Sequence, residues 1–233
     1  MQLHRRLLLA AALAALCVPA VGAEIVPYLT AKQLDLLQIL PPPPAAGSAT
    51  DQADVAAVIA AQKDADAARI ALAQHDVDES VFVMFTATLG DKFVTGNLPI
   101  ATLFFDRVGQ SEDDTVDPAK TQYGRVRPYL AHADDIKPLV KATKSQSYPS
   151  GHTTRVTMMA ILLGDMLPEK KAEIWARARE YAHSRVVGGM HYPTDIDAGV
   201  IAGTAMATTM LADPAFRADF AAAKAEVRKV MGY

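Results

Sequence analysis

The chain has 233 residues, of which 51% are hydrophobic and 6% aromatic, with 23 Lys and Arg against 26 Asp and Glu. Its net charge of −3 lacks the excess of basic residues that nucleic-acid binding requires, so no nucleic-acid partner is expected. The length suits one domain of roughly 200 residues with a sizeable core.

The first 23 residues have the pattern of a secretory signal peptide. Arg5 and Arg6 precede an apolar stretch, and Val21-Gly22-Ala23 provides a small-residue cleavage site. We therefore expect a mature chain from residue 24, located in the periplasm. The later apolar runs are shorter than the about 20 residues that span a bilayer, so no membrane association is expected after cleavage. The one cysteine, Cys17, lies inside the signal, which leaves the mature chain without disulfides.

The mature chain divides into a proline-rich arm and a helical domain. Residues 24–50 include four consecutive prolines at 41–44, which predict an extended arm lying over the domain. From residue 51 to residue 233 the spacing of apolar residues and the abundance of alanine predict an all-α domain. Asp117-Pro118, Leu167-Pro168 and Asp213-Pro214 mark helix starts. Helices are expected over 51–75, 80–90, 98–110, 117–126, 151–167, 168–183, 193–211 and 214–231.

Lys120 and Arg127 form the first of three segments that suit an anion. They lie seven residues apart, or two helical turns, so both side chains are expected on one helix face. Taken alone, two basic residues at this spacing are more often a solvated helix face. Their significance comes from the other two segments.

The second segment is Tyr148-Pro149-Ser150-Gly151-His152-Thr153. Ser150 is placed to cap a helix, and the N–H groups of a helix start form a cradle for an anion. The glycine at 151 lets an oxygen approach the backbone closely. Alone, this segment would be as consistent with an ordinary capped helix and an incidental histidine.

The third segment runs from Arg185 through Gly188-Gly189 to His191-Tyr192-Pro193-Thr194-Asp195. The proline fits the first turn of a helix, which places Asp195 beside His191. The carboxylate is then expected to accept the imidazole Nδ1–H and leave Nε2 unprotonated, as in an activated nucleophile. In isolation, a histidine followed by an aspartate four residues later is more often a surface pair.

Together the three segments resemble the type 2 phosphatidic acid phosphatase superfamily, which includes vanadium haloperoxidases. The stretch Ser-Tyr-Pro-Ser-Gly-His-Thr at 147–153, the signal and the arm are similar to the bacterial class A non-specific acid phosphatases. The resemblance implies a single-domain, compact, all-α helical bundle of that type. It also implies a metal-independent acid phosphatase that hydrolyses phosphate monoesters of broad specificity and needs no cofactor.

The resemblance further implies a role for each site residue. His191 would attack phosphorus to form a phosphohistidine, Asp195 would orient His191, and His152 would protonate the leaving alcohol and then activate water. The remaining residues would hold the non-bridging oxygens of the phosphoryl group, with positive charge in place of a metal. These phosphate-binding residues are Lys120, Arg127, Ser150, Gly151 and Arg185.

Several alternatives remain open on the sequence. The same residues would serve a phosphotransferase to alcohols or nucleosides, a vanadate-dependent haloperoxidase or a membrane-associated lipid phosphatase. From other classes, His183, His191 and Asp195 could ligate zinc, or the chain could bind phosphate without turnover. A homodimer is compatible with the alanine-rich helices, which would equally fill a core.

Overall fold

The structure, a computed structural model, describes residues 25–233; the signal peptide expected at 1–23 lies outside these residues. The described part is helical and contains no strand, which confirms the all-α prediction. Within it, no helix combines the length and the apolar character that crossing a membrane requires. The helices are η1 (Leu36–Gln38), α1 (Ala49–Asp64), α2 (Ala67–His75), α3 (Val81–Leu89), η2 (Thr95–Asn97), α4 (Pro99–Tyr123), α5 (Pro128–Ala131), α6 (Gly151–Met166), η3 (Pro168–Lys170), α7 (Lys171–Val187), α8 (Pro193–Ala212) and α9 (Pro214–Met231).

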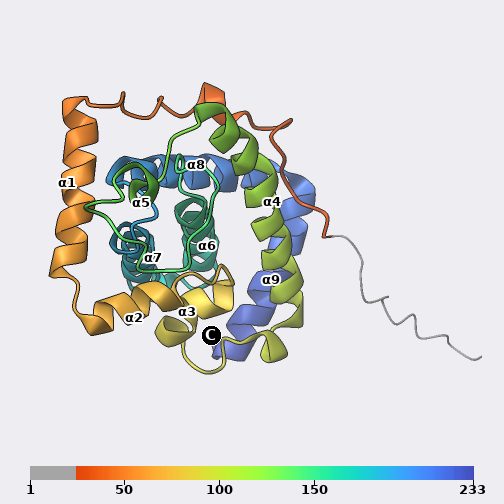
Figure 1. The fold of residues 1–233 in the computed structure, drawn as a ribbon. Coiled ribbons are helices and arrows are strands. Elements are labelled where there is room, and N and C mark those ends of the chain that lie inside the picture. The colour runs from red at the N-terminus through yellow and green to blue at the C-terminus, as the bar shows by residue number, and fades with distance from the viewer. Residues whose placement is uncertain (1–24) are drawn as a thin grey trace, which may run out of the picture.

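Helix α6 is the centre of the fold. It packs mainly against α8 and α7 and also touches α3, α4 and α9. Figure 1 shows it surrounded by the other helices, with α4 and α9 along one side and α1 on the other. Twelve of its sixteen residues are buried, so α6 is buried on most of its circumference rather than along one stripe. The start of this central helix is therefore held rigidly by the whole domain.

Two glycines of α8 allow it to approach α6 closely. A Cβ atom at Gly199 would lie 2.8 Å from the carbonyl oxygen of Ser150, and one at Gly203 would lie 2.5 Å from that of Thr154. Real Cβ atoms do not come so near to backbone atoms, so larger residues would push the helices apart. This contact positions the N-terminus of α6 against α8.

The residues before α1 form a segment that runs along the edge of the domain from α4 and α9 to α1 (Figure 1). Leu29, Leu36 and Leu40 are buried in the main core. The backbone N–H of Tyr28 donates to Ser111 Oγ at 2.8 Å, and its ring meets Phe216 edge to face. The segment is thus attached through side chains and backbone, and α1 begins at Ala49, two residues before the expected start.

The helix expected over 51–75 is two helices in the structure. α1 ends at Asp64, and α2 starts anew after Asp66, whose carboxylate accepts the N–H of Arg69 at 2.7 Å. An aspartate followed by an unbroken alanine-rich stretch resembles a helix interior, so its use as an N-cap was not apparent.

The helices expected over 98–110 and 117–126 are one continuous helix, α4, and Asp117-Pro118 lies inside it. Because proline has no N–H, Pro118 cannot bond the carbonyl of Asp114. That carbonyl instead accepts the N–H of Ala31 from the N-terminal segment, at 3.4 Å. A contact between distant parts of the chain thus compensates for the proline. By contrast, Asp213-Pro214 does begin α9, as predicted.

Replacing Gly203 with alanine should destabilise the domain. The added methyl would meet the Thr154 carbonyl, and overpacking of this kind costs about 1–3 kcal/mol. Urea unfolding should show a lower midpoint for Gly203→Ala. Gly96→Ala is the matched control, since no atom lies within 4 Å of its Cβ position. Equal stability of the two variants would contradict the close α6–α8 contact.

Candidate active site

A cavity of about 400 Å³ lies over the N-terminus of α6. It is bounded by α4, by the loop between α5 and α6, by the end of α7 and by the loop between α2 and α3. Six of the eight residues predicted for the site line it, namely Lys120, Arg127, Gly151, His152, Arg185 and His191. The other two, Ser150 and Asp195, are fully buried behind this lining. All three sequence segments therefore converge on one cavity.

Ser150 begins α6 as predicted. Its hydroxyl accepts the backbone N–H of Thr153 at 3.3 Å. A Cβ at Gly151 would lie 2.8 Å from Glu112 Oε1 and 3.6 Å from Lys120 Cε. The glycine therefore makes room for two side chains of α4, in addition to leaving the helix N-terminus open. Burial raises the pKa of Glu112 to about 7.

The tautomer of His191 follows from its two partners. Nδ1 lies 2.8 Å from the carbonyl oxygen of Ser147, which can only accept. Nε2 lies 3.0 Å from Arg127 Nη1, which can only donate. His191 is therefore protonated on Nδ1 and carries its lone pair on Nε2. Burial, reinforced by Arg127 and Lys120, holds the pKa of His191 well below its ordinary value.

Asp195 is not the hydrogen-bond partner of His191 that the sequence predicted. Its Oδ2 lies 3.6 Å from Nδ1, while the Ser147 carbonyl takes the closer position. Oδ2 instead accepts from Ser147 Oγ at 2.5 Å and from the N–H of Tyr192 at 2.8 Å. The carboxylate thus fixes the segments on both sides of the imidazole and adds negative charge beside it.

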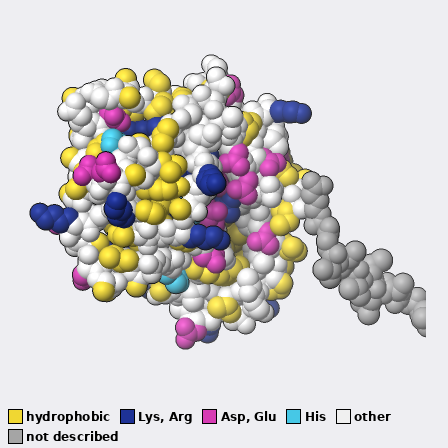
Figure 2. Space-filling view, viewed as in Figure 1, with side chains coloured by type: hydrophobic (Ala, Val, Ile, Leu, Met, Phe, Trp, Pro, Cys, Tyr) yellow, Lys and Arg dark blue, Asp and Glu magenta, His cyan; other side chains and the backbone are white. Residues whose placement is uncertain are grey.

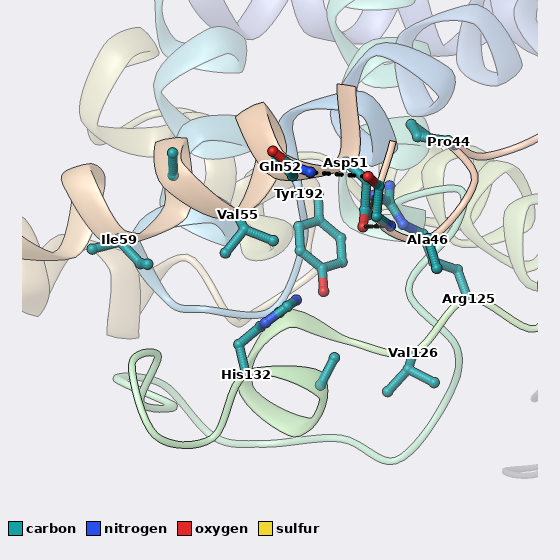
Figure 3. Close-up of a pocket in the computed structure, with 13 residues that line it drawn as sticks. Pro44, Ala46, Asp51, Gln52, Val55, Ile59, Arg125, Val126, His132 and Tyr192 are labelled. Carbon is teal, nitrogen blue, oxygen red and sulfur yellow. Dashed lines mark hydrogen bonds and ion pairs between the residues drawn. The ribbon is translucent and has the colours of Figure 1, made fainter. Parts of the chain in front are cut away.

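Arg125 connects Asp195 to α1. Its Nη1 donates to Asp195 Oδ1 at 2.7 Å, and its Nη2 donates to Asp54 Oδ2 at 2.9 Å. Its guanidinium also lies 4.0 Å from the centre of the Tyr192 ring. A second cavity, of about 620 Å³, is lined by Arg125 and Tyr192 among others. Figure 3 shows Arg125 at one end of that cavity and the Tyr192 hydroxyl pointing toward His132.

Lys120 and Arg127 do not share a helix, although both reach the cavity. α4 ends at Tyr123 and turns at Gly124 (φ 65°), and Arg127 precedes α5. Lys120 Nζ donates to the Pro149 carbonyl at 2.9 Å, and burial lowers its pKa to about 8. Arg127 Nε donates to the Ser145 carbonyl at 2.6 Å, and burial lowers its pKa to about 10. Backbone carbonyls thus position both cations.

Arg185 is 1% exposed, and its Nε and Nη1 have no hydrogen-bond partner among residues 25–233. Leaving buried donors of a charged group unpaired is costly. A compact anion that accepts from both nitrogens would remove this cost, and a guanidinium fork suits a phosphate. Burial lowers the pKa of Arg185, but an arginine side chain remains charged.

His152 lies between two acceptors from the loop before α3. Its Nδ1 is 2.8 Å from Glu79 Oε1, and its Nε2 is 3.2 Å from the carbonyl oxygen of Val77. Burial and Arg185 lower the pKa of His152, whereas Glu79 opposes them. Burial also opposes ionisation of Glu79, but the hydrogen bond from His152 lowers the pKa of that carboxyl to about 2.

Sequence reasoning missed Glu79, Glu112, Arg125 and Ser147 as parts of the site. Arg125 stands two residues before Arg127, so a basic pair next to Pro128 was a signal that could have been used. Glu79 and Glu112 have no local pattern that separates them from surface carboxylates. Only the packing of α3 and α4 against α6 identifies them.

The zinc alternative is not supported by the arrangement of its residues. His183 is exposed and lines another cavity, beside Trp175 and Arg179, whereas His191 lines the cavity over α6. Between residues 25 and 233 no group of three or more His, Cys, Asp or Glu side chains is placed to hold a metal ion.

The described residues thus form a helical fold with one cavity in which three buried cations lie beside a neutral imidazole. A family model described as the PAP2 superfamily matches residues 100–218. A non-specific acid phosphatase of Providencia stuartii is 30% identical over 211 residues, which cover 87% of this chain and 85% of that protein. The chain belongs to the PAP2 superfamily, and it is a phosphoric monoester hydrolase, as the resemblance predicted.

Other relatives and solved structures agree with this family. An acid phosphatase of Zymomonas mobilis is 30% identical over 153 residues, 64% of this chain and 58% of that protein. A transmembrane PAP2 type phosphatidylglycerolphosphate phosphatase from Bacillus subtilis has a similar structure, with a TM-score of 0.51 and 20% identity over 70% of this chain and 85% of that one. A bacterial vanadium-dependent iodoperoxidase also scores 0.51 at 20% identity, over 72% of this chain and 51% of that one. These two likenesses concern the fold.

Arg125→Ala should be strongly destabilising, because it leaves the buried carboxylates Asp54 and Asp195 without their cation. Breaking a buried ion pair on one side costs about 3–5 kcal/mol. The control is Lys224→Ala, which removes a largely exposed pair with Asp165 that is worth about 0–1 kcal/mol. Urea unfolding would measure both. If Arg125→Ala lowered the free energy of unfolding no more than the control does, Arg125 would not be the cation that stabilises Asp54 and Asp195.

Proposed function

We propose that this protein is an acid phosphatase that hydrolyses phosphate monoesters through a phosphohistidine on His191, with no metal in the reaction. The observation that carries the proposal is the pairing of two groups at one cavity. Arg185 presents buried nitrogens that lack a partner within residues 25–233, and His191 Nε2 carries a lone pair. The first group suits a phosphoryl oxygen, and the second suits attack on its phosphorus.

In the first step, the His191 Nε2 lone pair forms a bond to phosphorus while the bond from phosphorus to the ester oxygen breaks. His152 donates a proton to that oxygen, which leaves as the alcohol. The Nε2–H of His152 faces the Val77 carbonyl at 3.2 Å, so the ester oxygen would take the place of this carbonyl. Asp195 and the Ser147 carbonyl stabilise the His191 ring as it becomes positive.

In the second step, His152 takes a proton from water, whose oxygen attacks phosphorus. The bond from phosphorus to Nε2 breaks, and inorganic phosphate leaves. Lys120, Arg127 and Arg185 remain in contact with the non-bridging oxygens throughout, together with the N–H groups at the start of α6. Three fixed cations supply the charge stabilisation that phosphoryl transfer needs.

Broad specificity and a periplasmic location are parts of the same proposal. Lys120, Arg127, Arg185 and the N–H groups at the start of α6 would all contact the phosphoryl group rather than the alcohol, so many alcohols should be accepted. The sequence pattern of residues 1–23 is the support for export.

His191→Ala should abolish turnover of p-nitrophenyl phosphate while leaving the protein folded. In the wild-type enzyme, mixing with labelled substrate and stopping the reaction in alkali should recover a protein-bound phosphate that acid removes, as a phosphohistidine requires. Peptide mapping should place the label on His191. Near wild-type turnover by His191→Ala, or a label on another residue, would refute the nucleophile.

The pH profile provides a second test. His191 must be neutral and His152 protonated, and burial lowers the pKa of both, so both limbs of kcat/KM should lie below neutrality. Glu79 acts against this effect, because its carboxylate raises the pKa of His152. Glu79→Gln should therefore move the basic limb to lower pH by roughly one unit. The exposed Glu173→Gln is the control, and substrate ionisation is the same in all proteins. An unmoved basic limb would exclude the Glu79–His152 coupling.

A further inference from the structure

The cavity that receives the phosphoryl group also has an acidic wall. Four carboxylates line it, from Glu79, Glu112, Asp113 and Asp117. Near the middle of the face drawn in Figure 2, Asp and Glu side chains gather over α4 beside Lys and Arg side chains. Burial raises the pKa of Glu112 to about 7, so this carboxyl is largely neutral below neutrality. Carboxylates that stay ionised are unexpected in a site for a dianion, because they repel the substrate's phosphate.

Helix α4 orders the charges along one face. Asp113, Asp117 and Lys120 stand at positions i, i+4 and i+7, so they share a side of the helix. With a rise of about 1.5 Å per residue, Asp117 lies about 4.5 Å along the axis from Lys120, and Asp113 about 10.5 Å. All three side chains line the same cavity. A substrate whose phosphoryl group contacts Lys120 would therefore have Asp117 about one helical turn away.

The carboxylates differ in how far they are neutralised. Glu79 contacts His152, and Arg155 pairs with Glu112 and Asp113 at 2.8 Å each. Asp117 is exposed and makes no ion pair with any residue between 25 and 233. Lys141, from the loop before α6, also lines the cavity. Asp117 is thus the carboxylate that a substrate's own positive charge can meet.

We propose that this wall favours, among the many phosphate monoesters that the site accepts, those whose alcohol carries a positive charge a few bonds from the ester oxygen, such as amino or quaternary ammonium alcohols. The inference rests on the proposed phosphatase function. The buried nitrogens of Arg185, which lack a partner within residues 25–233, would bind the phosphoryl group, and Asp117, which lines the same cavity, would meet the cation. Alcohols that carry a carboxylate or a second phosphate are disfavoured by the same charge.

The test compares choline phosphate with 3,3-dimethylbutyl phosphate, which has the same shape without the positive charge. The ratio of their kcat/KM values is measured for the wild-type enzyme and for Asp117→Asn. Because the leaving groups differ in acidity equally for both proteins, only the change in the ratio reports the carboxylate. We expect the ratio to fall roughly three- to tenfold in Asp117→Asn and less in Asp113→Asn, whose charge Arg155 already balances.

Two further measurements complete the design. Raising the salt to about 0.5 M should lower the wild-type ratio and leave that of Asp117→Asn unchanged. Asp91→Asn, on an exposed turn away from the cavity, should keep the wild-type ratio. If kcat/KM fell by the same factor for both esters in Asp117→Asn, the carboxylate would act only through Lys120. That result would overturn the inference. Wild-type enzyme that hydrolyses neither ester nor p-nitrophenyl phosphate would instead refute the proposed function and this inference with it.

Discussion

The burial of positive charge around one small cavity is the constraint on which the site depends. Lys120, Arg127 and Arg185 are each at most 6% exposed and point into the same space. Burial removes their hydration, which lowers the pKa of each, and repulsion from a neighbouring arginine adds to this effect for Lys120 and Arg127. Fixed backbone carbonyls hold Lys120 and Arg127, while two nitrogens of Arg185 have no hydrogen-bond partner within residues 25–233. The same cations keep the neighbouring imidazole neutral.

Rigid support for this cluster comes from the middle of the fold. α6 starts at the cavity and packs against α7 and α8. The glycines of α8 allow α8 to approach α6 closely. The loop before α6 supplies the carbonyls of Ser145, Ser147 and Pro149 to three different site residues. Backbone carbonyls of this loop therefore position the side chains of Lys120, Arg127 and His191.

The sequence predicted the parts of this site that rest on local patterns. The caps at Ser150 and Asp213 start helices as expected, because capping depends on a few adjacent residues. Local sequence patterns gave wrong helix boundaries where a contact between distant residues determines the structure. Pro118 is tolerated inside α4 because Ala31 serves the carbonyl that proline leaves open. Similarly, Glu79 reaches His152 only after folding, so no spacing along the chain reveals it.

The guanidinium of Arg125 ties the first helix of the domain to the carboxylate beside His191. Asp51 and Asp54 bind it from α1, and Asp195 binds it from α8. This one side chain therefore links two helices that lie about 140 residues apart in the chain. Chimaeras that exchange α1 among relatives must therefore transfer these acidic residues together with the arginine. Otherwise the recombined protein buries charged side chains without their partners.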